Sequence, residues 1–207
     1  MTNRLLSFGR QVFDFALEHQ IVGTNPFVGI RRHAEKKRRR LITQAEFAAI
    51  RAAAGARLQV VMDVLYFTGQ RIDDVLNIRV HDLVEDGIYF KQKKTGAELI
   101  VRWTPELRAV VERAKALGGN VRALTLLYNR RGKAPDYRSV YLQWQTACEK
   151  AAVEDAHLHD VRAMAATEVG AERATALLGH ADARTTRIYL RDRSVPVVDG
   201  PRKVLGA

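Results

Sequence analysis

Most of the chain repeats apolar residues at helical spacing, and one short region breaks that repeat. On either side of this region, apolar residues recur three and four positions apart, which places them on one face of a helix. Within it, segments 87–92 and 98–103 have the character of strands and flank the turn Lys94-Thr95-Gly96. Amphipathic helices bury their stripes by packing on one another. The sequence therefore predicts a mainly α fold with one small antiparallel β-sheet, an α+β class.

Local signals place the starts of two helices. Thr43 and Glu46 have the spacing of a capping box, and Thr104-Pro105 offers a helix cap followed by a first-turn proline. Two or three short helices are expected over residues 159–192. The apolar residues 124–128 are a candidate third strand.

The N-terminal segment predicts a separate helix over residues 4–19. Its apolar residues lie three or four positions apart and form one stripe. Gly23 and Asn25-Pro26 then end the segment. A lone helix cannot bury such a stripe by itself, so we expect it to pack on the rest of the chain or on another molecule. The residues of the stripe are Leu5, Phe8, Val12 and Phe15.

Positive charge is concentrated just after this helix. The net charge of the chain is +11, and residues 31–40 hold seven Lys or Arg and one Glu, which supplies +6 of it. So dense a run releases counterions efficiently when it lies on DNA, although a solvated linker is the simpler alternative. A membrane surface is disfavoured because no apolar face accompanies the run. The predicted DNA contacts in it are Arg31, Arg32, Lys36, Lys37, Arg38, Arg39 and Arg40.

Composition favours a soluble protein in a reducing cytoplasm. No apolar run approaches the ~20 residues that a membrane span needs, and the first residues lack the apolar segment of a signal peptide. The single cysteine, Cys148, cannot form an internal disulfide. It falls among the apolar positions of an expected helix, so we interpret it as a core residue.

The C-terminal third contains a group of residues suited to phosphate chemistry. His159 and Arg162 lie three positions apart, so they would share a face at the start of a helix, where the helix dipole favours an anion. Leu178-Gly179-His180 follows, and Tyr189 comes nine residues after His180. Each element alone is weak: the His–Arg pair could be a chance surface pair, and Tyr189 an ordinary half-buried tyrosine.

Taken in order, these elements resemble the tyrosine recombinase family, also called phage-type integrases. The resemblance rests on H-x-x-R, L-G-H and the later tyrosine, together with Thr68-Gly69-Gln70-Arg71 upstream and the K-T-G of the hairpin turn, which places the family lysine at Lys94. It covers about residues 41–192. The implied organisation is a remnant of a helical core-binding domain at 1–30, a basic linker at 31–40, a catalytic domain at 41–192 and a tail at 193–207.

The resemblance implies that Tyr189 attacks a DNA phosphate and forms a 3′-phosphotyrosyl bond. Arg71 and Arg162 would hold the non-bridging oxygens, a role that suits guanidinium because its planar fork stays charged and makes bidentate contacts. A free tyrosine has a pKa of ~10 and keeps its proton near neutral pH. A base must therefore remove that proton, and the resemblance assigns this role to His159.

The remaining roles follow from the same resemblance. Lys94 would donate a proton to the leaving 5′-oxygen, and His180 would hydrogen-bond the phosphate or the attacking tyrosine. The covalent intermediate conserves the energy of the phosphodiester bond, so no cofactor is expected. Asp74 stands where the family usually has Glu and would support the catalytic residues with a shorter reach, with a plain surface acid as the alternative. Lys91 and Lys93 are expected to make general phosphate contacts or to remain solvated.

The implied partners are double-stranded DNA and further copies of the chain, in a tetramer on DNA. The implied setting is the cytoplasm of a bacterium, with the protein bacterial or phage-encoded and associated with the nucleoid. Most of the usual N-terminal DNA clamp is missing from this sequence, so a DNA-binding remnant without productive recombination is one alternative.

Two further alternatives remain open at this point. A type IB topoisomerase would use much the same residues to relax supercoils as a monomer. A metal site could recruit Cys148, His157, His159 and His180, but their spacings match no common zinc pattern. We therefore expect no metal.

Overall fold

The computed structural model describes residues 2–34, 38, 40–117, 123–129 and 132–190. The chain divides into two units, Met1–Arg39 and Arg40–Ala207, which are described separately below. In the described part, no helix is both long and apolar enough to cross a membrane.

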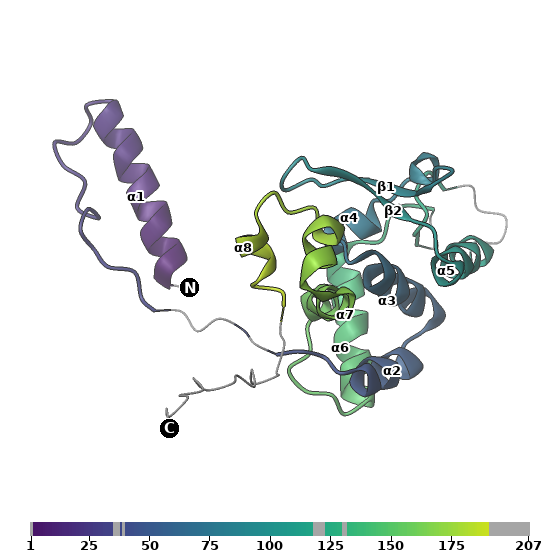
Figure 1. The fold of residues 1–207 in the computed structure, drawn as a ribbon. Coiled ribbons are helices and arrows are strands. Elements are labelled where there is room, and N and C mark those ends of the chain that lie inside the picture. Colours follow the sequence, from purple (N-terminus) through teal and green to yellow (C-terminus); the bar gives the residue numbers. More distant parts are fainter. Residues whose placement is uncertain (1, 35–37, 39, 118–122, 130–131, 191–207) are drawn as a thin grey trace, which may run out of the picture. The chain divides into compact units, whose positions relative to one another are not determined.

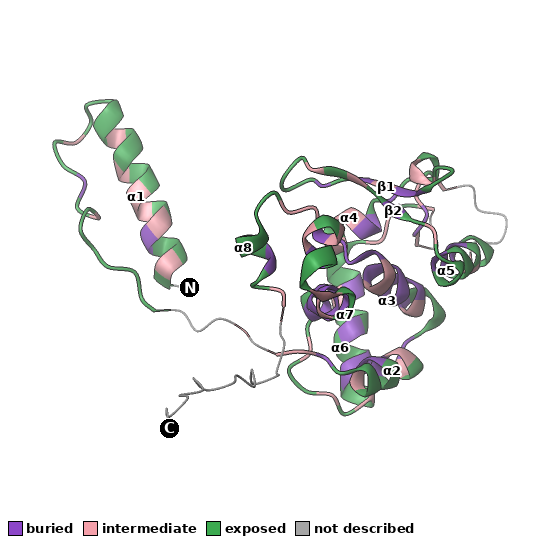
Figure 2. Cartoon of the chain, viewed as in Figure 1, coloured by how far each residue is buried: buried purple, intermediate pink, exposed green. Residues whose placement is uncertain are grey.

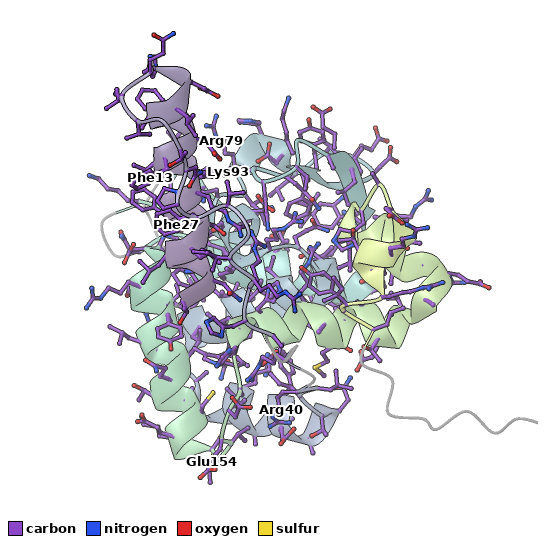
Figure 3. The ribbon with its side chains drawn as sticks, turned by 90° about the vertical axis from the view of Figure 1, so that its left-hand side faces the viewer. Phe13, Phe27, Arg40, Arg79, Lys93 and Glu154 are labelled. Carbon is purple, nitrogen blue, oxygen red and sulfur yellow. The ribbon has the colours of Figure 1, made fainter. Side chains whose placement is uncertain are left out.

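The described part of the first unit is one helix, α1 (Thr2–Glu18), followed by a return segment, residues 19–34, that packs along one of its faces. Phe27 of the return segment lies on Phe13, with ring centroids 5.4 Å apart (Figure 3). Asn25 donates to the Asp14 carboxylate at 2.6 Å and accepts from the backbone N–H of Phe27 at 2.9 Å. A Cβ at Gly9 would lie 2.7 Å from the Phe27 ring, so glycine permits this close approach. The helix expected over 4–19 is confirmed.

The opposite face of α1 is the predicted apolar stripe, and the described part of the first unit does not cover it. Phe8 is 66% exposed and Leu5 63% exposed, so the return segment does not cover this face. The stripe therefore remains available for packing on another surface.

In its described residues, the second unit is mainly helical with a single hairpin, as expected (Figure 1). Its helices and strands, with one 3₁₀ turn η1, are α2 (Gln44–Ala53), α3 (Ala56–Thr68), α4 (Ile72–Leu76), η1 (Val80–Asp82), β1 (Gly87–Lys91), β2 (Glu98–Arg102), α5 (Pro105–Ala116), α6 (Tyr137–Lys150), α7 (Leu158–Leu178) and α8 (Ala183–Thr186).

Helix starts follow the local signals. Thr43 Oγ1 accepts from the Glu46 N–H at 3.2 Å, and the Glu46 carboxylate accepts from the Thr43 N–H at 2.9 Å, which completes the capping box of α2. Thr104 caps α5 by accepting from the Leu107 N–H at 3.2 Å. α3 ends at Gly69, whose φ of +62° is in the left-handed region that glycine adopts without strain.

The core is built around α3. This helix is buried over most of its length (Figure 2), and α2, α5 and α7 all pack against it. Trp144 of α6 is fully buried, and its indole N–H donates to the Ala156 carbonyl at 2.9 Å. Cys148 is buried as well, which agrees with its expected place in the core. Burial raises the pKa of its thiol to about 11.

The sheet has two strands, and the third strand expected at 124–128 is wrong. β1 and β2 pair antiparallel, with Gly87 opposite Arg102 and Lys91 opposite Glu98. Segment 124–128 instead pairs briefly with residues 78–80: the Leu126 N–H donates to the Ile78 carbonyl at 2.8 Å. The chain turns into η1 directly after Arg79, so this pairing cannot extend into a ladder.

The described residues 158–190 contain three helical pieces, in line with the two or three expected over 159–192. Gly170 has φ 79° and ψ 162°, a conformation closed to other residues, and it divides α7 into two segments. The second segment ends at Gly179, with φ 62°. α8 then leads to Tyr189. Residues 191–207, which include the expected tail, lie outside the described residues.

Candidate active site

Arg162 is the buried centre of the candidate site. It lies in the first turns of α7 and is only 1% exposed. Its Nη1 donates to the Gly69 carbonyl at 2.6 Å, and its Nη2 donates to the Leu178 carbonyl at 2.9 Å. Burial, followed by the positive charge of Arg71, lowers the pKa of Arg162 to about 10. The guanidinium therefore stays charged at neutral pH and is held at the ends of α3 and α7.

Tyr189 packs against three of the predicted residues at once. Its ring centroid is 5.4 Å from the His159 ring and 5.3 Å from the His180 ring, and the Arg162 guanidinium carbon lies 5.3 Å from the Tyr189 ring centroid. The Tyr189 N–H donates to the Thr186 carbonyl at 2.8 Å, so α8 folds the chain back toward α7. The fold thus brings the tyrosine to both histidines and to the buried arginine.

His180 is held between Arg162 and Thr186. Its Nε2 is 3.2 Å from Arg162 Nη2, and its Nδ1 is 3.0 Å from Thr186 Oγ1. Arginine can only donate, so Nε2 must accept, and the proton of the neutral ring lies on Nδ1. Burial and the charges of Arg162 and Arg71 lower the pKa of His180 to about 4. At neutral pH this ring is therefore uncharged.

Arg71 stands at the N-cap position of α4, where the chain leaves α3. It is half-buried, and its Nη1 donates to Gln92 Oε1 at 2.5 Å. Its charge lowers the pKa of both Arg162 and His180, which puts its positive field within the same site. Both predicted arginines therefore act on the surroundings of Tyr189.

The acidic residue Asp74 joins α4 to the hairpin. Its Oδ1 accepts from the Lys93 N–H at 3.0 Å. Its Oδ2 is buried and has no hydrogen-bond partner among the described residues. The Asp74 carboxylate also favours the charged form of Arg162 by raising its pKa. The supporting role expected of Asp74 remains a prediction.

Lys94 is the predicted catalytic residue that the structure does not bring into contact with the others. It lies in the hairpin turn with its side chain exposed. Within the described part of the chain, no contact joins it to Tyr189 or to either arginine. Its neighbour Lys91 pairs with Glu98 at 2.9 Å across the two strands. A role for Lys94 in catalysis would thus require the turn to approach a bound DNA backbone.

Gln92, which is not among the residues predicted from the sequence, is fully buried beside Arg71. The alternation of inward-facing and outward-facing residues along β1 is the signal from which it could have been predicted. Ile88 and Phe90 are buried core residues, and Gln92 continues their inward-facing series where the strand ends. A polar residue at an inward-facing position next to a candidate site needs internal hydrogen-bond partners.

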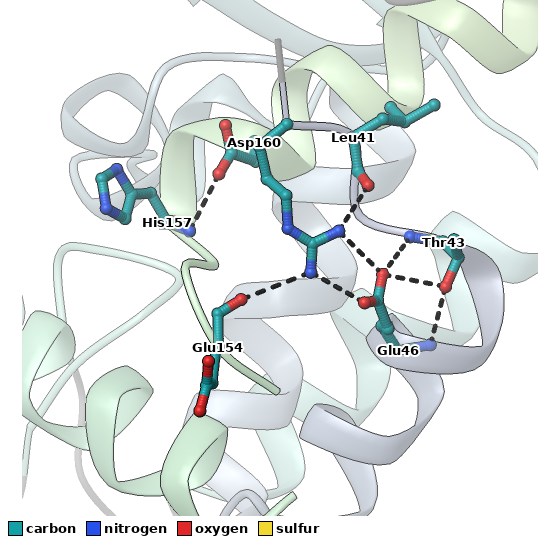
Figure 4. A network of polar contacts seen from close by, with 7 residues as sticks. Leu41, Thr43, Glu46, Glu154, His157 and Asp160 are labelled. Carbon is teal, nitrogen blue, oxygen red and sulfur yellow. Dashed lines mark hydrogen bonds and ion pairs between the residues drawn. The ribbon is translucent and has the colours of Figure 1, made fainter. Parts of the chain in front are cut away.

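Arg40 occupies a network at the start of the second unit, shown in Figure 4. Its guanidinium contacts both oxygens of Glu46, at 2.7 and 3.1 Å, and donates to the carbonyls of Leu41 at 2.8 Å and Glu154 at 3.4 Å. The pKa of Glu46 is lowered to about 2, and the hydrogen bonds from Arg40 contribute most to this shift. This geometry favours a structural role for Arg40 over the DNA contact predicted from its place in the basic run.

The other basic residues of the 31–40 run belong to the first unit. Arg31 and Arg32 are exposed in the first unit, where Arg32 donates to Ser7 Oγ at 3.0 Å. Arg38 is half-buried. Lys36, Lys37 and Arg39 lie outside the described residues. Their contacts with DNA remain predictions.

The chain is similar to a known protein family. The family model described as Phage integrase family matches residues 34–194. Among curated proteins, the integrase of Escherichia phage HK022 is 32% identical over 102 residues, which are 48% of this chain and 29% of that protein. The tyrosine recombinase XerC of Pelobacter propionicus is 30% identical over 166 residues, covering 70% of this chain and 52% of XerC. The chain thus spans between about a third and a half of the length of these relatives.

Solved structures show the same fold. A lambda integrase dimer bound to a COC′ core site superposes with a TM-score of 0.80 at 21% identity, over 94% of this chain and 60% of that one. The lambda integrase catalytic core superposes with a TM-score of 0.61 at 22% identity, over 68% of this chain and 91% of that one. Because the family model covers most of the sequence, the chain belongs to the phage integrase family.

Proposed function

We propose that this chain is a site-specific tyrosine recombinase that cleaves and rejoins double-stranded DNA through a 3′-phosphotyrosyl intermediate. One observation carries the proposal: the Tyr189 ring lies within 5.4 Å of both histidine rings and of the Arg162 guanidinium. A nucleophile, two imidazoles and a buried cation are thereby gathered at one place on the second unit.

The two arginines supply the binding of the scissile phosphate. Arg162 already donates through Nη1 and Nη2, but its Nε is buried without a hydrogen-bond partner among the described residues. A phosphate oxygen would provide such a partner, and Arg71 would add a second positive charge. Interactions of this kind strengthen as negative charge builds on the oxygens in the transition state.

Cleavage exchanges one phosphorus–oxygen bond for another. Tyr189 Oη attacks the phosphorus while its proton passes to His159, and the bond from phosphorus to the 5′-oxygen breaks. The 5′-oxygen leaves as a hydroxyl after taking a proton, for which Lys94 is the candidate donor. Religation runs the same steps in reverse. Because the phosphotyrosyl bond retains the energy of the original phosphodiester, the cycle needs no nucleotide cofactor.

His180 serves this chemistry by orienting its neighbours. Its neutral ring accepts from Arg162 and donates to Thr186, so it links α7 to the α8 segment that carries Tyr189. A phosphate bound by the arginines would offset the charges that lower the pKa of His180. The ring could then take up a proton and donate to the phosphate.

The expected partners are double-stranded DNA and further copies of this chain. The lambda integrase structures similar to this fold include a dimer bound to a core site and a tetramer bound to a Holliday junction. The basic run at 31–40, with Lys91 and Lys93, would contribute general phosphate contacts. The division into a 1–30 remnant, a linker, a 41–192 catalytic domain and a tail belongs to the same proposal, as does a cytoplasmic location.

Covalent trapping tests the proposal directly. Nicked duplexes of random sequence, designed so that the cleaved fragment diffuses away, should accumulate a protein–DNA adduct that survives denaturation. Tyr189→Phe removes only the hydroxyl and should form no adduct. Absence of an adduct with the unaltered chain, or its persistence in Tyr189→Phe, would refute the proposed chemistry.

A second candidate is DNA binding or cleavage without productive recombination. Relaxation of a supercoiled plasmid without recombinant products would favour a topoisomerase-like cycle. Binding without any adduct would leave only the DNA-binding function.

A further inference from the structure

Gln92 sits at the junction of four parts of the site. It is the first residue after β1, it is fully buried, and its amide contacts the hairpin turn, the start of α4, the end of α3 and the end of α7. A buried amide costs free energy unless its hydrogen bonds are made. At this position every one of them is made.

The oxygen of the amide accepts two hydrogen bonds. Arg71 Nη1 donates to Gln92 Oε1 at 2.5 Å, and Thr95 Oγ1 donates to the same oxygen at 2.9 Å. Thr95 directly follows Lys94 in the turn. The oxygen therefore ties the guanidinium of Arg71 to the turn that carries the candidate proton donor.

The nitrogen of the amide donates two hydrogen bonds. Gln92 Nε2 lies 2.8 Å from Gln70 Oε1 and 2.8 Å from the Leu178 carbonyl. An arginine only donates and a carbonyl only accepts, so these neighbours fix which end of the amide is oxygen. Both donors and both acceptor positions of Gln92 are used.

The Leu178 carbonyl is shared between Gln92 and Arg162. Arg162 Nη2 donates to it at 2.9 Å, so one chain of hydrogen bonds runs from Arg71 through Gln92 and Leu178 to Arg162. Gly179 follows Leu178, and a Cβ at Gly179 would lie 2.7 Å from Gln92 Nε2. The turn that presents His180 thus depends on close contact with this amide.

We propose that Gln92 is a positioning residue that fixes the spacing of the two arginines and holds the Lys94 turn and the His180 turn against them. This inference rests on the proposed function, because the arginines and Tyr189 are assumed to act on phosphate. Gln92 itself touches no reacting atom in the proposed cleavage. It acts by keeping Arg71 in place before DNA arrives.

Substitution by methionine tests this role because the side chain keeps its length and loses all four hydrogen bonds. Gln92→Met should slow single-turnover adduct formation roughly 10- to 100-fold, the effect expected when a charged donor loses its buried partner. Affinity for the same duplexes should change less than about threefold, because most phosphate contacts lie elsewhere. Asp63→Asn, in a separate cluster where Asp63 pairs with Arg51 at 2.7 Å, controls for a general loss of stability.

A double-mutant cycle separates positioning from general destabilisation. If Gln92 acts through Arg71, then Gln92→Met should slow the Arg71→Ala variant by less than about threefold. Asp63→Asn should have the same relative effect in both backgrounds. An equal slowing by Gln92→Met with and without Arg71 would overturn the proposal.

Two further measurements decide the case where the first variant or the first assay fails. Thr95→Val removes the hydrogen bond that Thr95 Oγ1 donates to Gln92 Oε1 and the longer one, 3.4 Å, that it accepts from the Ala97 N–H. If Gln92→Met does not fold, an unchanged rate in Thr95→Val overturns the proposal, and a rate reduced roughly threefold or more supports it. If the unaltered chain forms no adduct, the proposed function is refuted, whatever the role of Gln92. Proton exchange of the Arg71 guanidinium, followed by NMR in the free protein, then tests Gln92: faster exchange in Gln92→Met supports positioning, and unchanged exchange refutes it.

Discussion

Replacing Gly179 by alanine should weaken the second unit more than the same change at a glycine of similar backbone conformation. Gly179 has φ +62°, and a Cβ there would lie 2.7 Å from Gln92 Nε2 and 2.9 Å from Leu99 Cδ2. Gly96, in the hairpin turn, has φ +72°, and a Cβ there would meet nothing within 4 Å. The two sites therefore share the backbone cost and differ in the contacts with Gln92 and Leu99.

The expected magnitudes follow from these two terms. An alanine in the left-handed region costs about 1–2 kcal/mol, and this is the whole effect expected for Gly96→Ala. Gly179→Ala must also displace the Gln92 amide, which leaves its buried partners incompletely hydrogen-bonded at a cost of about 1–3 kcal/mol. The total expected loss in unfolding free energy at Gly179 is about 2–5 kcal/mol.

Urea unfolding followed by tryptophan fluorescence measures this difference. Both tryptophans of the chain, Trp103 and Trp144, lie in the second unit, so the signal does not depend on α1. Gly179→Ala should shift the midpoint further than Gly96→Ala with little change in slope. Equal shifts would show that the turn at Gly179 tolerates a side chain, and the close contact between this turn and Gln92 would then be refuted.

Three other perturbations give clear expectations. The pKa of His180 is lowered from 6.5 to about 4, so between these pH values the unfolded chain binds more protons and the stability of the fold falls as pH falls. In His180→Gln, the urea midpoint should depend less on pH across this window. An unchanged pH dependence would contradict the lowered pKa. Arg40→Gln should lower the unfolding free energy by about 1–2 kcal/mol through lost contacts with Glu46, yet leave the salt dependence of DNA binding almost unchanged. Neutralising the basic residues at 36–39 should instead flatten that salt dependence. A flatter salt dependence in Arg40→Gln alone would restore the predicted role of Arg40 as a DNA contact. Adduct formation should be the same with and without a metal chelator, and its loss on chelation would show that a metal takes part.

The sequence was most informative where structure depends on neighbouring residues. The capping box of Thr43 and Glu46 and the Thr104 cap each involve residues within a few positions, and both appear in the structure. The hairpin at 87–102 is also local, since its turn and its alternation lie in one stretch. Such elements can be predicted because the chain supplies their hydrogen-bond partners nearby.

Contacts between segments far apart in the sequence cannot be predicted from local patterns. Gln92 meets the Leu178 carbonyl, 86 positions away, and Arg40 meets the Glu154 carbonyl, 114 positions away. The basic run predicts that Arg40 contacts DNA, because charge density alone cannot reveal an internal partner such as Glu46. The strand expected at 124–128 failed for a similar reason: the neighbouring segment, 78–80, is too short to extend the pairing.

The charges proposed to bind phosphate also make the site unfavourable in the free protein. Arg162 is buried with Nε unpaired among the described residues, and the pKa values of Arg162 and His180 are both lowered, in each case first by burial and then by neighbouring arginines. A fold does not gain stability from such a group, so its placement must be maintained by other interactions. Packing around α3 stabilises the unit, and the Gln92 amide fixes the geometry. A phosphate would supply the missing acceptor and the missing negative charge, so the site should become more ordered and the pKa of His180 should rise when DNA binds.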